Sequence, residues 1–207
     1  MREAGGVGGG EPRQGSGPAD GMGERPTGAG IGTGNGTGIR TGTGAGTGAV
    51  ALIGELGLRP HPEGGWYREL HRSTVMVQRE RDGAIRSAQT LIAYLLQRGE
   101  CSRWHRVGGS DEIWFHAAGA PLDLWSLPPQ GGTATLLGLG SLTLDPSPSG
   151  DRPVQVIAAD GWQAARSRGD WSLVHCAVGP GFAFDDFQLL AALPAELRPA
   201  GAREDLL

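Results

Sequence analysis

His105 and Glu112 are the side chains whose types and spacing most clearly suggest chemistry. They lie in two short alternating segments, SRWHRV (102–107) and EIWFHAA (112–118), which the turn-forming residues GGSD connect. Strand side chains alternate between two faces, and a short hairpin places its strands side by side. His105, Glu112 and His116 are therefore predicted to face one cavity. An imidazole beside a carboxylate can transfer protons, bind a polar ligand or coordinate a divalent metal.

A second group of candidates follows from the stretch HPEGG (61–65). Glu63 precedes its two glycines, and Tyr67 and Glu69 share one strand face with His71 in the next segment, WYRELHRS. Proline and two glycines are also ordinary turn residues, so HPEGG by itself is compatible with a simple loop. A tyrosine beside a carboxylate can orient or protonate a substrate oxygen, so we expect Glu63, Tyr67 and Glu69 at the pocket.

Two tryptophans and a glutamine complete the candidate set. Trp114 is in phase with Glu112, and Trp162 adjoins Gln163 in the segment WQAARSR. Tryptophans are more often core residues than ligand platforms, but these two are expected near the ligand. The remaining histidines are expected to lie at the surface or to be satisfied within the fold: His61, His71 and His175.

Composition divides the chain at about residue 48. Residues 1–48 contain half of the 38 glycines and no aromatic residue. Such a stretch buries too little apolar surface to offset its chain entropy, so a disordered Gly/Thr-rich tail is expected. Its G-x-G repeats do not predict a nucleotide site, because no strand precedes them and the chain has no P-loop lysine. Residues 49–207 are expected to form one domain.

The elements predicted for this domain are a short helix between Ala49 and Gly57, followed by short strands that Gly, Pro, Asp or Ser separate. The predicted strands occupy residues 66–73, 84–97, 102–107, 112–118, 121–127, 133–139, 153–159, 162–168, 171–178 and 182–190. Many short strands without intervening helices are typical of a β-sandwich or jelly roll. In the last of them, PGFAFDDF is expected to pack the final strand, with Asp186 capping a turn. We therefore predict an all-β barrel.

Charge and composition exclude several classes of function. A net charge of −4 without a basic run offers nothing to nucleic acid. No stretch approaches the roughly 20 apolar residues of a membrane span, and no apolar signal-peptide region is present, so a cytoplasmic protein is expected. The chain has no lysine, which excludes Schiff-base chemistry. Cys101 and Cys176 do not suggest a disulfide, and Cys176 is expected to be a buried thiol.

Five blocks of this sequence resemble a small, largely uncharacterised cupin family that includes a yeast cupin of unknown function. They are HPEGGWYRELHRS (61–73), LIAYLLQRGECSRWHRVGGSDEIWFHAAGAPLDLW (91–125), LGLG (137–140), QVIAADGWQAA (155–165) and VGPGFAFDDFQLL (178–190). The combination of HPEGG, WHR…DEIW and PGFAFDDF is highly specific. The resemblance implies an RmlC-like cupin jelly-roll barrel, a homodimer and a ligand pocket in the barrel, without a settled reaction.

The same resemblance bears on metal binding. The first cupin signature, G-x5-H-x-H-x(3,4)-E-x6-G, fits residues 99–119 except at Val107, which stands where metal cupins have their second histidine. His116 or Gln163 would have to replace that donor to complete a metal site. We therefore expect neither a metal nor another cofactor.

These observations predict a metal-independent cupin that binds a small polar, sugar-like metabolite. As an isomerase or epimerase, by analogy with carbohydrate epimerases of the same fold, it would use His105 to move a proton, Glu112 to orient His105, and Tyr67 to return a proton from the other side. A non-catalytic binding or sensor module would use the same pocket. A metal-dependent oxygenase is disfavoured by Val107. The sequence does not separate the first two alternatives.

Overall fold

The computed structural model describes residues 47–141 and 150–207 of the chain. Its first element is the helix α1 (Thr47–Glu55), which confirms the predicted short helix and begins two residues before the predicted domain boundary. The disordered tail predicted for residues 1–48 otherwise falls outside the described residues. In the part of the chain that is described, no helix has the length and apolar character needed to cross a membrane.

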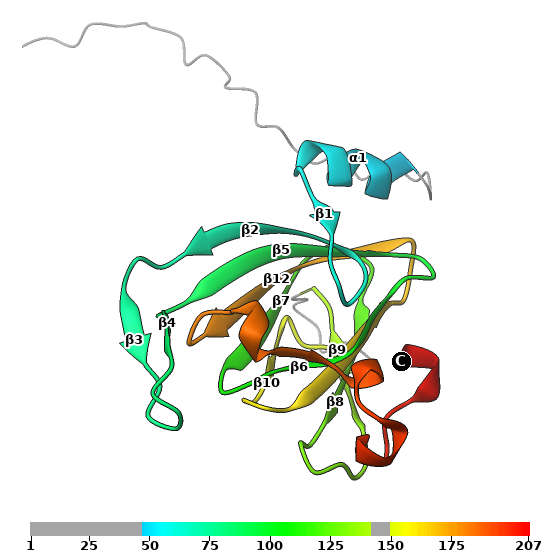
Figure 1. The fold of residues 1–207 in the computed structure, drawn as a ribbon. Helices are drawn as coiled ribbons and strands as arrows, with labels where there is room; N and C mark the ends of the chain where they lie inside the picture. Colours follow the sequence, from blue (N-terminus) through cyan, green and yellow to red (C-terminus); the bar gives the residue numbers. More distant parts are fainter. Residues whose placement is uncertain (1–46, 142–149) are drawn as a thin grey trace, which may run out of the picture. The chain divides into compact units, whose positions relative to one another are not determined.

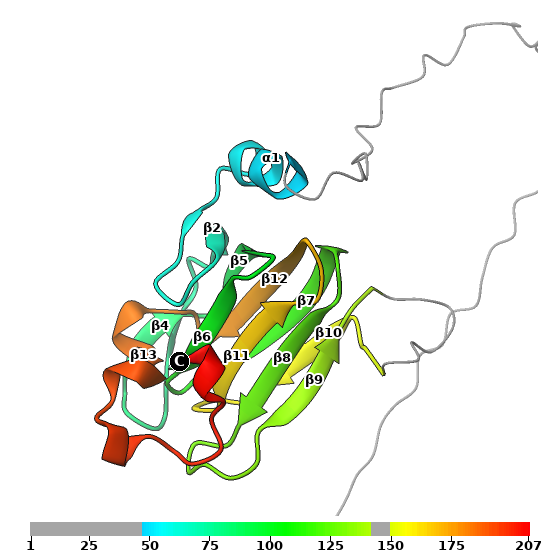
Figure 2. The same cartoon turned by 90° about the vertical axis from the view of Figure 1, so that its right-hand side faces the viewer.

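Two antiparallel sheets form a barrel, as Figures 1 and 2 show. The first sheet contains, in spatial order, β1 (Arg59–Pro60), β2 (Trp66–Arg72), β5 (Thr90–Gln97), β12 (Trp171–Gly179), β7 (Asp111–Gly119) and β10 (Val154–Ile157). The second contains β13 (Phe187–Leu189), β6 (Cys101–Val107), β11 (Trp162–Ser167), β8 (Leu122–Leu127) and β9 (Thr135–Leu139). Neighbouring strands often lie far apart in the sequence. This order confirms the predicted all-β jelly-roll barrel.

Two predicted strands differ from the observed elements. The strand predicted over 84–97 is divided into β4 (Ile85–Ser87) and β5, because residues 88 and 89 bond to the chain before β3 (Met76–Gln78) instead of continuing one strand. The hairpin β3–β4 stands beside the barrel (Figure 1). The strand predicted over 182–190 is reduced to β13, which follows the 3-10 helix η1 (Phe184–Asp186). Three further 3-10 helices end the chain: η2 (Leu190–Ala192), η3 (Ala195–Leu197) and η4 (Glu204–Leu206).

Apolar side chains pack in three clusters. The cluster between the sheets includes Trp114, Leu122, Leu124 and Leu139, and it fills the barrel toward the Leu96 end of β5. The other two clusters cover the outer faces of the sheets. Helix α1 packs on the first sheet through Ala49, Leu52 and Ile53. The C-terminal 3-10 helices pack on the second through Leu190 and Leu206. Because the inner cluster occupies one end, the Thr90 end of β5 is left for polar side chains.

Candidate functional site

A cavity of about 220 Å³ lies between the two sheets at the Thr90 end of β5. Cross-strand rows of the first sheet form one wall, because directly opposed residues project to the same side. The rows that line the cavity are Arg59, Tyr67 and Tyr94; Glu69, Ile92 and Cys176; and Arg72, Thr90, Val178 and Glu112. The second sheet and its neighbouring segments contribute His105, Val107, Phe182, Ala183, Phe184 and Phe187.

The loop formed by residues 61–65, between β1 and β2, carries His61 and Glu63 into this cavity. Its two glycines allow the loop to lie directly on the barrel. Gly64 has φ +114°, and a Cβ there would be 2.2 Å from the carbonyl oxygen of Cys101. Gly65 has φ +64°, and its Cβ would meet the Leu95 carbonyl oxygen at 2.8 Å. Only glycine fits both the left-handed backbone and this close approach.

Glu63 is the centre of a buried polar cluster. Its Oε2 lies 3.2 Å from His105 Nε2 and 3.3 Å from His61 Nδ1, and its Oε1 accepts a 2.8 Å hydrogen bond from the Ser102 hydroxyl. Burial alone would raise the pKa of Glu63, but the charge of His105 and the hydrogen bonds from His61 and Ser102 outweigh burial and lower the pKa to about 2. The Glu63 carboxylate is therefore ionised at neutral pH.

Both ring nitrogens of His105 face acceptors. Nδ1 lies 2.8 Å from the backbone carbonyl oxygen of Arg103, while Nε2 faces the Glu63 carboxylate. Only the doubly protonated imidazolium donates to both, so His105 and Glu63 form a buried ion pair. This arrangement corrects the prediction that His105 pairs with Glu112. It also leaves His105 no free nitrogen with which to take a proton from a ligand.

His61 is held by the same carboxylate but keeps one nitrogen free. Its Nε2 has no hydrogen-bond partner among the residues that the structure describes. The backbone amide of Glu63 donates a hydrogen bond to Nδ1 at 3.4 Å, and the Glu63 carboxylate faces the same nitrogen at 3.3 Å. In the tautomer that donates from Nδ1 to the carboxylate, Nε2 presents a lone pair to the cavity. The sequence prediction had left His61 out of the site, although its spacing of two from Glu63 was an available signal.

Glu112 reaches the cavity from β7 and has a different environment. Gln163 donates to its Oε2 at 2.5 Å, and the Gln163 carbonyl oxygen accepts a 2.9 Å hydrogen bond from the Trp114 indole. Burial raises the pKa of Glu112, and the negative charge of Glu63 adds to burial; together they outweigh His105 and Gln163, which act in the opposite direction. The pKa of Glu112 is thus raised, in the direction opposite to the shift of Glu63.

Charged side chains surround the cavity mouth. The Arg59 guanidinium lies over the Tyr67 ring, with Cζ 4.9 Å from the ring centroid. Arg72 donates to Glu69 at 2.7 Å and to the Phe182 carbonyl oxygen at 3.0 Å. Tyr67 and Glu69 therefore line the cavity as predicted, together with two arginines that the sequence did not single out.

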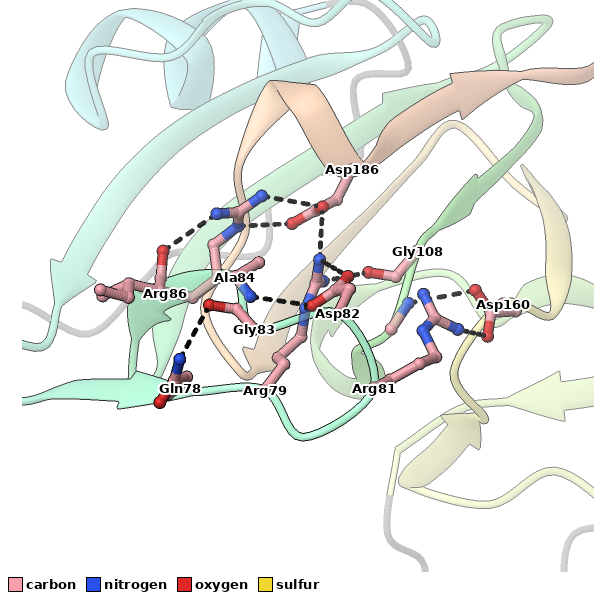
Figure 3. Close-up of polar contacts among 12 residues, drawn as sticks. Gln78, Arg79, Arg81, Asp82, Gly83, Ala84, Arg86, Gly108, Asp160 and Asp186 are labelled. Carbon is pink, nitrogen blue, oxygen red and sulfur yellow. Dashed lines mark hydrogen bonds and ion pairs between the residues drawn. The ribbon is translucent and has the colours of Figure 1, made fainter.

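An aromatic wall closes one side of the cavity and consists of Phe182, Phe184 and Phe187. Asp186, within this segment, is bound by the β3–β4 hairpin (Figure 3). Arg86 donates to its carboxylate through Nε at 2.7 Å and Nη2 at 3.0 Å, and Arg79 donates at 2.9 Å. Arg79 also donates to the Gly108 carbonyl oxygen at 2.6 Å. Asp186 was predicted to cap a turn, but it joins the aromatic wall to a distant hairpin.

Residues 50–190 match the model of the family described as Cupin superfamily (DUF985). The chain belongs to this cupin family. Among solved structures, this cupin is similar to a hypothetical protein from Leishmania major, with 29% identity and a TM-score of 0.61 over 68% of this chain and 85% of that one. It is also similar to a protein from Shewanella oneidensis, with 34% identity and a TM-score of 0.59 over 68% of this chain and 83% of that one. The comparison with curated proteins found no significant match.

Two predicted site residues of the cupin lie away from the cavity. His116 shares the inner face of β7 with Glu112, but it lies opposite Val174 toward the filled end of the barrel, where its Nε2 is 3.0 Å from the Ala120 carbonyl oxygen. Trp162 projects from the other face of β11 and packs in the cluster behind the second sheet. Strand alternation already excludes Trp162 from the face of its neighbour Gln163.

Gln163 and Trp114 have supporting positions rather than lining ones. Both are buried behind Glu112, where their hydrogen bonds orient its carboxyl group. On β2, a register shift between Glu69 and His71 places Arg72 at the cavity in the position where alternation predicts His71.

The donor set of this cupin does not fit a metal ion. Val107 presents an apolar side chain to the cavity, and both nitrogens of His105 are engaged. Within residues 47–141 and 150–207, no three His, Cys, Asp or Glu side chains are placed to hold a metal.

Proposed function

We propose that this cupin binds a small polar, sugar-like metabolite and moves a proton on it, as an isomerase or epimerase. One observation carries the proposal: two buried carboxyl groups line one cavity, and their pKa values are shifted in opposite directions. Sites that divide acid and base roles between two groups commonly separate the pKa values in this way. The neighbours of Glu63 and Glu112 assign those roles.

Glu63 is suited to orient a base rather than to act as one. A carboxylate with a pKa of about 2 accepts protons poorly at neutral pH, because an efficient base has a pKa near the working pH. It holds His61 in the tautomer whose Nε2 lone pair is free. When Nε2 takes a proton, the resulting imidazolium is stabilised by the same carboxylate. His61 therefore replaces His105 as the proposed proton acceptor, and His105 supports the charge of Glu63.

Glu112 is the proposed acid. A carbon that gives its proton to His61 Nε2 leaves an electron pair, which must pass to an adjacent carbonyl oxygen of the ligand. Protonated Glu112 can donate a hydrogen bond or a proton to that oxygen. Delivery of the His61 proton to the former carbonyl carbon, with a hydroxyl proton of the ligand passing back to Glu112, completes an isomerisation. Delivery of a proton from Tyr67 to the opposite face of the original carbon, with the oxygen returning its proton to Glu112, completes an epimerisation. The Tyr67 ring lies 4.5 Å from the His61 ring centroid, which places it beside the proposed base.

The cavity volume supports a ligand of the size of a single sugar. At about 220 Å³ the cavity is smaller than the roughly 300–1,000 Å³ that accommodate drug-sized molecules. Its lining combines the aromatic wall with carboxyl, imidazole and hydroxyl groups, a combination that suits the apolar faces and hydroxyl edges of a sugar.

Native mass spectrometry of protein purified from its source would identify a co-purified ligand. Incubation of that ligand with the protein in D₂O would then measure proton exchange at carbon. We expect the wild type to incorporate deuterium and His61→Asn to slow incorporation by about 10²-fold or more. His175→Asn, on the outer face of β12, is the matched control. A ligand that binds without deuterium exchange would instead identify a non-catalytic binding module.

A further inference from the structure

Arg59 is the one cation of the cavity lining to which the structure, over the residues it describes, gives no acidic partner. The other cations are paired: Arg72 with Glu69 at 2.7 Å, and His105 with Glu63 at 3.2 Å. No hydrogen bond or ion pair among the described residues engages the Arg59 guanidinium, which rests only on the Tyr67 ring. A positive charge at the mouth is thus available to a ligand.

The chain places this charge in line with the proposed base. Residues 59, 61 and 63 alternate along the entering segment, and all three side chains line the cavity, from exposed Arg59 at the mouth to buried Glu63 inside. Arg59 Cζ and the His61 ring lie 4.9 Å and 4.5 Å from the centroid of the same Tyr67 ring. A single small ligand can therefore contact Arg59, Tyr67 and His61 together.

We propose that Arg59 binds an anionic group, carboxylate or phosphate, of the metabolite on which His61 acts. This inference rests on the proposed function and names the class of its substrate. The guanidinium fork matches both oxyanions, which it binds through two parallel hydrogen bonds.

Sugar acids and sugar phosphates fit this arrangement, because one small molecule then carries an anionic group for Arg59 and a carbon that can meet His61.

NMR of the arginine Nε–H groups tests the site directly, with inorganic phosphate and acetate as probes at constant ionic strength. We expect a saturable shift of the Arg59 signal, and the anion that binds more tightly distinguishes phosphate from carboxylate. D-glucose, which is neutral, is expected to leave this signal unchanged. Arg68 lies exposed on the opposite face of β2, opposite Ala93, so its signal is the internal control.

Variants then connect the site to the ligand. Arg59→Gln is expected to weaken binding of D-glucose 6-phosphate or D-glucuronate at least tenfold, whereas Arg68→Gln removes the same charge without effect. Equal shifts at both arginines, or unchanged affinity in Arg59→Gln, would overturn the inference. Anion binding at Arg59 without deuterium exchange would refute the proposed function alone. Exchange on a neutral ligand, insensitive to Arg59→Gln, would refute this inference alone.

Discussion

Replacing Glu63 by glutamine should destabilise the protein in a strongly pH-dependent manner. The substitution keeps the shape of the side chain but removes the charge that pairs with His105 and His61. In the folded protein the pKa of Glu63 is lowered from 4.5 to about 2, which corresponds to roughly 3 kcal/mol of stability at neutral pH. Because the folded-state pKa is depressed, this contribution is complete above about pH 4.5 and is lost as the pH falls toward 2.

Urea unfolding of the wild type and Glu63→Gln at several values between pH 7 and pH 3 measures this difference. The two proteins should differ by about 3 kcal/mol at pH 7 and converge as the solution becomes acidic. Glu69→Gln is the control, because its pair with Arg72 is partly exposed and should contribute less than about 1 kcal/mol. A difference that does not change with pH, or a Glu63→Gln protein as stable as the wild type at pH 7, would refute the assignment of a buried ion pair.

Three further predictions concern the loop, the acid and the metal. Gly64→Ala should lower the free energy of unfolding in urea by about 3 kcal/mol or more, because the new Cβ would be 2.2 Å from the Cys101 carbonyl oxygen. Gly99→Ala is the control: Gly99 has φ +83° but no close neighbour, so this substitution should cost about 1 kcal/mol. The melting temperature of Glu112→Gln should exceed that of the wild type at pH 8 and be close to it at pH 5. The reason is that the folded-state pKa of Glu112 is raised, so its buried carboxyl group destabilises the wild type only as it ionises. Elemental analysis after purification without chelators should find substoichiometric metal; nearly one equivalent, lost in His105→Ala, would contradict this.

The barrel could be predicted from the sequence because its strands are short, alternate in character and are separated by turn residues. Of the residues that alternation assigns to the two predicted strand faces, Tyr67, Glu69, His105 and Glu112 line the cavity, whereas His71 and His116 do not. These predictions depend only on local periodicity, which the chain retains wherever a strand is regular.

The partners within the site could not be predicted in the same way. Alternation fails at the register shift in β2, where Arg72 replaces His71 at the cavity. The pair between His105 and Glu63 joins a strand to a loop 42 positions earlier in the sequence, a contact that exists only because the loop packs on the barrel. Local pattern predicts which face a side chain occupies, but it carries no information on which distant carboxylate meets it.

The contacts of Asp186 with the β3–β4 hairpin limit how the aromatic wall can be changed to alter ligand preference. Arg86 in the hairpin and Asp186 in the wall segment are 100 positions apart in the sequence, but their ion pair holds the two segments together. If the wall segment were replaced by that of a relative without the matching hairpin, either a carboxylate or a guanidinium would lose its ion-pair partner. The Phe184 side chain makes none of these polar contacts and is largely exposed, so Phe184 is the position at which the wall can be varied while the contacts of Asp186 are kept.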